Sequence, residues 1–245
     1  MHQGPVTVTA TEHGTRLDNQ PVSRSATVDG VPDFVNRHEY DNRDRWIARS
    51  HDPDGDGPLD FTDTFFVYDG TPPSGSLLDR AAVTMENIGQ FVLHFEADSQ
   101  RDPQLAHRYL WGLAVDQILA DERVIGPTAP GNIVWPLTDH LNTVRDLAMY
   151  DANTDTTTIA NHLIYDAYGR ITSQSDPDHT TLFTFTAHPF DPATGLQNNL
   201  NRWYDAQVGR WMSEDPIGFE AGAPNLYRYI EDISNVNVDS EGEAW

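Results

Sequence analysis

The 245-residue sequence contains no cysteine, which excludes disulfide bonds and thiolate metal sites within the chain. It also has no apolar run of membrane length, so we expect no membrane insertion. Basic residues are scarce, because 15 Lys and Arg stand against 38 Asp and Glu and give a formal net charge of -23. A surface that acidic repels phosphate backbones, so the composition argues against nucleic acid as a partner.

The start of the chain lacks the basic and apolar regions of a signal peptide. Residues 1–35 are polar and interrupted by glycine and proline, so we expect a poorly ordered lead-in, although the alternation at residues 6–9 could form one strand. Long helical periodicity is absent as well. The segment from Ala114 to Glu122 could make one short turn of helix.

Short alternating segments indicate β-strands instead. Phe91, Leu93 and Phe95 recur at every second position, and Phe183 and Phe185 alternate with threonines. This period of two is typical of strands with one buried face. We therefore expect an all-β protein built mostly of antiparallel hairpins.

Five of the nine tyrosines are followed directly by aspartate, namely Tyr40, Tyr68, Tyr150, Tyr165 and Tyr204. The fullest copy, residues 165–171, reads YDAYGRI. Tyrosine favours the end of a strand, aspartate caps a tight turn, and Gly169 can adopt the positive φ that the turn needs. The irregular spacing indicates a decayed array of hairpins rather than a strict solenoid.

The segment after residue 182 carries a series of family motifs. It closely resembles the core domain that ends RHS-repeat (YD-repeat) proteins, through FD at 190–191, TGL at 194–196, RWYD at 202–205, GRW at 209–211, SEDPIG at 213–218 and NLYRY at 225–229. Residues 108–120 and 138–145 resemble the family segment just upstream. The resemblance implies a degenerate YD-repeat region at 36–180 and an RHS repeat-associated core at 181–245.

In this family, YD repeats wind into a β-spiral that forms a hollow shell, and the core forms or plugs one end. The resemblance therefore implies a partial shell that ends in a core cap. It implies a structural capping or encapsulation fragment of a secreted or cell-surface protein, with upstream YD repeats or other shell segments as partners. The family's variable C-terminal segment, often a toxin, usually follows the core, and we expect none in a chain that stops at Trp245.

The resemblance also implies a candidate autoprotease. In RHS cores, two Asp-Pro-x-Gly motifs supply the aspartates of an aspartyl autoprotease that cuts just after the second motif. Asp215 matches the first, and Asp239 matches the second in the altered form DSEG at 239–242, which places the cut near Glu243. Paired carboxylates that share a proton can activate water and protonate a leaving group. Arg210 could orient one carboxylate; the alternative is that both aspartates only cap turns.

An acidic loop gives a candidate calcium site. Aspartates fall at positions 1, 3, 5, 9 and 12 of a twelve-residue stretch with Gly57 at position 6, which is the ligand spacing of an EF-hand-like loop: Asp52, Asp54, Asp56, Asp60 and Asp63. The alternative is a solvated acidic turn between hairpins. A bound Ca²⁺ would support a third reading, a calcium-stabilised surface module that binds a glycan or a protein.

Overall fold

The computed structural model describes residues 7–11, 23–28, 31–41, 45–55, 61–68, 90–126, 129–221, 224–229 and 239. Within these ranges the regular structure consists of β-strands and two short 3-10 helices, with no α-helix. The ranges contain no helix that is both long and apolar enough to cross a bilayer. The predicted antiparallel all-β fold, an open partial shell, is confirmed.

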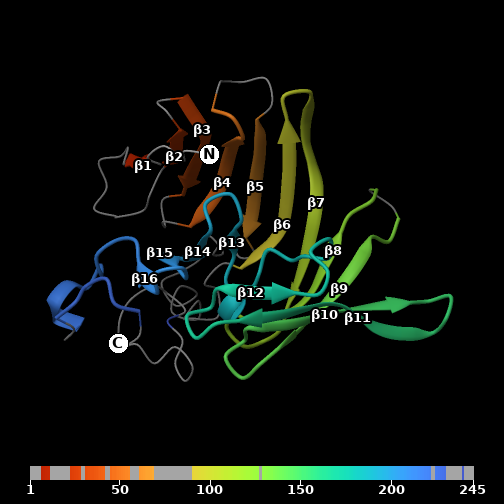
Figure 1. The fold of residues 1–245 in the computed structure, drawn as a ribbon. Coiled ribbons are helices and arrows are strands. Elements are labelled where there is room, and N and C mark those ends of the chain that lie inside the picture. The colour runs from red at the N-terminus through yellow and green to blue at the C-terminus, as the bar shows by residue number, and fades with distance from the viewer. Residues whose placement is uncertain are drawn as a thin grey trace, which may run out of the picture.

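In the described part of the chain, twelve strands form one large sheet, in which each strand pairs antiparallel with the next along the sequence (Figure 1). We call this sheet the wall. Since neighbours in the sheet are neighbours in the sequence, the antiparallel pairs need no crossover connection. The strands are β1 (Thr7–Thr11), β2 (Ser23–Val28), β3 (Val31–Tyr40), β4 (Trp46–Asp52), β5 (Thr62–Tyr68), β6 (Phe91–Asp98), β7 (Arg101–Trp111), β8 (Ile118–Arg123), β9 (Asn132–Thr138), β10 (Val144–Asp151), β11 (Thr156–Tyr165) and β12 (Ile171–Gln174).

A second, smaller sheet follows the wall. Its strands are β13 (Phe190–Asp191), β14 (Leu196–Asn199), β15 (Arg202–Asp205) and β16 (Arg210–Trp211), accompanied by the 3-10 helices η1 (Phe185–Ala187) and η2 (Gly218–Ala221). We call residues 181–229 together with residue 239 the core segment. Figure 1 shows the core segment at one end of the wall, within the curve of the large sheet.

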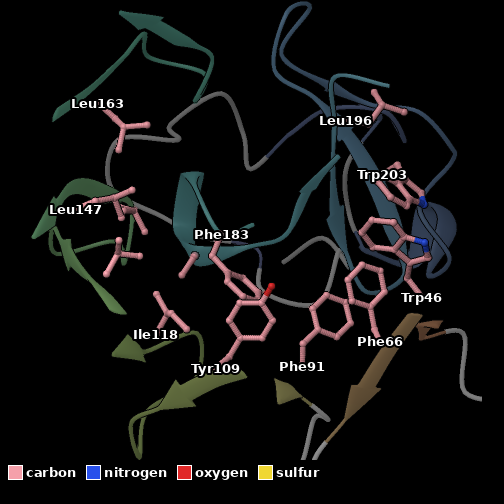
Figure 2. Close-up of a cluster of buried hydrophobic side chains, with 13 residues drawn as sticks. Trp46, Phe66, Phe91, Tyr109, Ile118, Leu147, Leu163, Phe183, Leu196 and Trp203 are labelled. Atoms are coloured by element: carbon pink, nitrogen blue, oxygen red, sulfur yellow. The ribbon is translucent and has the colours of Figure 1, made fainter. Parts of the chain in front are cut away.

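A cluster of buried side chains joins the wall to the core segment (Figure 2). Phe183 lies edge-on to two wall residues, with ring-centroid distances of 5.0 Å to Tyr109 and 4.7 Å to Trp111. The apolar face of each sheet is therefore removed from water by the other. The members are Trp46, Phe66, Phe91, Tyr109, Ile118, Val134, Val144, Leu147 and Leu163 from the wall, and Phe183, Ala187, Leu196 and Trp203 from the core segment.

The Tyr-Asp turn has the geometry that its sequence predicts. Between β11 and β12, the backbone N–H of Arg170 donates to Oδ1 of Asp166 at 3.1 Å, and Gly169 adopts a φ of 87°. Asp41 and Arg45, on either side of the β3–β4 connection, make the same contacts. The N–H of Arg45 donates to Oδ1 of Asp41 at 3.1 Å, and Nε of Arg45 donates to Oδ2 of Asp41 at 2.7 Å. In both places the aspartate pairs with the arginine four residues later.

The turn between β11 and β12 is also a place where the core segment packs closely. A Cβ atom at Gly169 would lie 2.3 Å from the ring of Phe185, and one at Gly209 would lie 2.8 Å from the ring of Tyr168. The hydroxyl of Tyr204 donates to the carbonyl of Tyr168 at 2.7 Å. Glycine is needed at both turns because the backbone has a positive φ and because a neighbouring ring occupies the place of a side chain.

Strands also occur in the described part of residues 1–35, the segment that we expected to be a poorly ordered lead-in. β1, β2 and the first part of β3 lie within residues 1–35, and their backbones pair in register, with Thr7 opposite Thr27 and Val28 opposite Val31. The alternation at residues 6–9 overlaps β1. Pairing with the next strand accounts for this order, since these residues are too polar to indicate a strand individually.

The helical turn predicted from Ala114 to Glu122 is wrong, because β8 occupies residues 118–123. Ile118 and Ala120 are buried, while Leu119 between them is exposed. β8 also pairs with β7 on one side and β9 on the other. Two ladders and a buried face outweigh the modest helical propensity of this segment.

Candidate functional site

Two aspartates of the core segment meet at one arginine. Nη2 of Arg202 lies 3.3 Å from Oδ2 of Asp215 and 3.2 Å from Oδ2 of Asp239. The three residues are buried, with exposed fractions of 0 %, 6 % and 2 %, respectively. The structure therefore brings together the two aspartates that the sequence motifs single out, and it places a guanidinium between them.

Asp215 is positioned by a tight turn that follows β16. Its N–H donates to the carbonyl of Leu226 at 3.1 Å, and its Oδ1 accepts from the N–H of Ile217 at 2.9 Å. Gly218 donates its N–H to the carbonyl of Asp215 at 2.9 Å and has a φ of 66°. One carboxylate oxygen of Asp215 thus caps the turn, while the other faces Arg202.

Arg202 is also held by groups other than the aspartates. It begins β15, and its guanidinium carbon lies 4.3 Å from the centre of the Trp211 ring. Its Nη1 donates to the carbonyl of Leu226 at 3.3 Å. On the other side of the site, Nδ2 of Asn199 donates to the carbonyl of Asp239 at 2.9 Å. The cation and its two partners are therefore fixed by independent contacts.

This geometry allows two chemical roles. Two neighbouring carboxylates repel each other unless a proton or a cation lies between them. In a proteolytic dyad a shared proton removes the repulsion, whereas here the guanidinium of Arg202 does so. The group can act as an ion-pair lock that holds residue 239 against β15, or as an acid–base pair. Burial raises the pKa of nearby Tyr229, and the charge of Asp239 raises it further, so Tyr229 stays protonated at neutral pH.

The structure places Arg210 away from this pair. Its side chain is exposed, and its guanidinium carbon lies 4.9 Å from the centre of the Tyr227 ring. Arg202 takes the place expected for Arg210, and sequence reasoning missed it. One signal could have revealed it: an arginine that starts a strand of buried aromatic residues needs an acidic partner, since arginine is almost never fully buried unless it is paired.

The candidate calcium loop is only partly within the described residues. Asp56 and Asp60 lie outside them, while Asp52 ends β4 and Asp63 lies in β5. Oδ1 of Asp52 accepts from the N–H of Gly55 at 2.7 Å, which is a turn contact. Among the described residues, no group of three or more His, Asp or Glu has a geometry that could hold a metal ion.

A second polar site joins the core segment to the wall. Asp191, at the end of β13, accepts from Nε2 of His38 on β3 at 3.1 Å and from Nη1 of Arg49 on β4 at 2.7 Å. Asp191 and His38 are buried almost completely. Burial would raise the pKa of the Asp191 carboxyl, but the hydrogen bond from His38 and the positive charge of Arg49 hold it well below its usual range.

Trp203 completes this junction. Its ring stacks on His38 with a centroid distance of 4.6 Å and an interplanar angle of 11°, and it meets Trp46 edge-on at 5.0 Å. Its Nε1 donates to the hydroxyl of Tyr40 at 2.7 Å. Figure 2 shows Trp203 and Trp46 facing each other across the boundary between the two sheets. The tyrosine of a wall turn therefore also anchors the core segment.

Comparison with known proteins gives partial matches along the chain. Teneurin-3 of Danio rerio is 27 % identical over 175 residues, which cover 67 % of this chain and 6 % of that protein. YibJ of Escherichia coli (strain K12) is 35 % identical over 80 residues, 32 % of this chain and 33 % of that protein. The chain therefore spans a third or less of the length of these relatives.

Solved structures show the same fold. TcdB2-TccC3 superimposes with a TM-score of 0.65 at 15 % identity, covering 97 % of this chain and 10 % of that chain. The Photorhabdus luminescens Tc holotoxin pore superimposes with a TM-score of 0.60 at 15 % identity, covering 90 % of this chain and 9 % of that chain. A family model of the Teneurin YD-shell matches residues 66–237, about 70 % of the sequence. The chain belongs to the Teneurin YD-shell family.

Proposed function

We propose that this chain is a structural capping and encapsulation segment, in which the wall encloses a space and the core segment closes one end. The observation that supports this best is the buried junction of Asp191 with His38 and Arg49. It joins positions 153 and 142 residues apart. Closing a chain loop of that length has an entropic cost, so such a contact persists only where the folded state holds it firmly.

The wall accounts for the proposed partners. In the described part of the chain, β1 and β12 each pair with one strand and leave their other edges unpaired. Unpaired edges accept further strands. We infer that other YD-shell segments extend the wall at these edges and complete the enclosure, in a secreted or cell-surface protein.

The cap can be tested by cutting the chain between the wall and the core segment. A protease recognition sequence inserted between Pro177 and Asp178, in an exposed turn, would separate the two parts covalently. We expect the fragments to co-elute in size-exclusion chromatography and to separate only in denaturant. The variant Asp191→Ala, Trp203→Ala should lose co-elution after cutting. Separation of the wild-type fragments without denaturant would contradict the capping role.

A second candidate function, aspartyl autoproteolysis, is supported by the convergence of Asp215 and Asp239 on Arg202. The proposed cut near Glu243 falls outside the described residues. The intact mass of purified protein tests it directly. Loss of the residues after position 242 or 243 in wild type, with the full mass in Asp215→Asn and Asp239→Asn, would establish cleavage. The full mass in all three proteins would leave the pair as an ion-pair lock.

A further inference from the structure

A polar cavity of about 520 Å³ lies between β6, β7, β8, β9 and the turn that carries His179. This volume is in the usual range for small-ligand sites. On the sheet, Asp121 is directly opposite Tyr109 on one side and Val134 on the other, so the three side chains share a face. Tyr109 and Val134 belong to the buried cluster that includes the core segment. The cavity therefore lies on the concave face of the wall.

Asp121, one of the residues that line the cavity, has an unsatisfied buried carboxylate oxygen. Asp121 is 1 % exposed, and its Oδ1 accepts from Nδ1 of His107 at 2.6 Å. Its Oδ2 is buried and has no hydrogen-bond partner among the residues that the structure describes. An unpaired buried acceptor is costly, and the cost is greater for a charged group. Asp121 thus presents an oxygen that a bound donor would satisfy.

The charges around the cavity favour a cationic donor. The lining includes three carboxylates, two guanidiniums and two imidazoles: Glu96, Asp121, Asp178, Arg101, Arg123, His107 and His179. Arg101 is paired with Asp98 outside the cavity, and His107 is hydrogen-bonded to Asp121. Burial, with the nearby charges of His107 and Arg49, lowers the pKa of His94 to about 3. His94 therefore brings no positive charge to this face at neutral pH. The whole chain, at a net charge of -23, also attracts cations.

We propose that this cavity binds a cationic nitrogen donor, an ammonium or guanidinium group, that hydrogen-bonds to Oδ2 of Asp121. His107 orients the carboxylate through Oδ1 and leaves Oδ2 for the ligand. A small free amine and the side chain of a lysine or arginine in an enclosed polypeptide offer the same chemistry. The biological role of the site rests on the enclosing function proposed above, whereas binding itself does not.

Calorimetric titration of the full chain with matched probes tests this proposal. N-acetyl-lysine methylamide and N-acetyl-arginine methylamide carry the cation, and N-acetyl-glutamine methylamide is the neutral control. We expect the cationic probes to bind at least about tenfold more tightly than the neutral one, the effect of one charge-assisted hydrogen bond. Butylammonium separates the two sources: equal affinity assigns a free amine, and weaker affinity assigns a side chain on a polypeptide backbone.

Two variants locate the binding. Asp121→Asn keeps the shape of the side chain and should weaken the cationic probes about tenfold or more. Asn132→Trp, at an exposed lining position, should block the cavity without altering Asp121. Asp155→Asn removes an acid from the exposed β10–β11 turn and should change nothing. Thermal melting confirms that each variant is folded.

Equal binding of the cationic and neutral probes, or cationic binding that survives Asn132→Trp, would overturn the proposal. So would binding to Asp155→Asn that is as weak as binding to Asp121→Asn, because the effect would then reflect overall charge. Co-elution of the two fragments after cleavage tests the capping function independently of ligand binding. Failure of this site and failure of the capping function are therefore distinguishable.

Discussion

Asp166 of the wall and Asp191 of the core segment occupy equivalent places, each following an aromatic residue at the end of a strand. Both cap a turn: Asp166 accepts from the N–H of Tyr168 at 3.0 Å, and Asp191 accepts from the N–H of Ala193 at 3.1 Å. The arginine that pairs with Asp166 lies four residues away on an exposed turn. The arginine that pairs with Asp191 lies 142 residues away, at a buried junction.

The same aspartate-capped turn therefore has a different role in the wall and in the core segment. In the wall, the aspartate completes a hairpin that depends on its neighbours in sequence, so strands can be added one after another. In the core segment, the same capped turn is buried against the wall, and its second carboxylate oxygen is available for His38. Repetition builds the sheet, and one long-range use of the repeated turn attaches the core segment to it.

The largest loss of stability should come from removing the long-range contacts of Asp191. We expect Asp191→Ala to lower the free energy of unfolding by about 3–5 kcal/mol, because it leaves a positive charge and a buried histidine without their partner. Urea unfolding followed by tryptophan fluorescence measures this, since Trp203 lies at the junction. A loss below about 1 kcal/mol would show that the junction does not hold the core segment.

The pH dependence of stability should distinguish the buried His94 of the wall from Asp191 at the junction. The folded pKa of His94 is about 3, below its unfolded value near 6.5, so the unfolded chain takes up a proton first as pH falls. His94 should therefore reduce stability progressively from about pH 6.5 to about pH 3, by at most about 1.4 kcal/mol per pH unit. The contribution of Asp191, whose folded pKa is depressed, is complete above about pH 4 and is lost below it.

Unfolding free energies at pH 7, 5.5 and 4.5 check this prediction. His94→Gln should flatten the decline across that interval, because the buried ionisable group is gone. His140→Gln, at an exposed turn position, is the matched control and should keep the wild-type slope. Equal slopes in wild type and His94→Gln would contradict the assignment.

Much of the wall could be predicted from the sequence because its determinants are local. The Tyr-Asp pair, Gly169 and the following arginine specify a turn within six residues, and the structure has that turn. The alternation of apolar residues in β6 did not predict correctly which side chains are buried. Phe91 and His94 are the buried members, while Leu93 and Phe95 are partly exposed, because bulges shift the register. A bulge depends on the partner strand, which the period of one strand does not reveal.

The candidate site was predictable in part. Motif resemblance singles out Asp215 and Asp239, but not the arginine between them, because Arg210 is nearer to Asp215 in sequence and Arg202 is nearer in space. Asp191 lies in the FD motif at 190–191, but no motif indicates that it pairs with His38 and Arg49. Pairs separated by more than 140 residues are set by how two sheets pack, and only the fold shows them.

A calcium-bound loop would be a wall connection held by a ligand instead of by its own hydrogen bonds. If Asp52, Asp54, Asp56, Asp60 and Asp63 bind Ca²⁺, calcium at a hundredfold excess over its dissociation constant should stabilise the fold by about 2.7 kcal/mol. Thermal melting with Ca²⁺, Mg²⁺ or EDTA measures the shift. Asp54→Asn, Asp56→Asn should abolish it. An unchanged melting temperature in Ca²⁺ would assign the loop as a solvated turn.

The smallest loss of stability should come from removing the local turn contacts of Asp166. Asp166→Ala removes two backbone hydrogen bonds and an exposed ion pair with Arg170, and we expect a loss of about 1 kcal/mol, typical of a cap. Asp166→Asn keeps an acceptor oxygen and should stay within about 0.5 kcal/mol of wild type. The same urea unfolding experiment applies. A cost of Asp166→Ala equal to that of Asp191→Ala would mean that the wall turn, and not the buried junction, limits stability. The wall and the core segment would then unfold together from their turns, and the contrast between local repetition and long-range closure would fail.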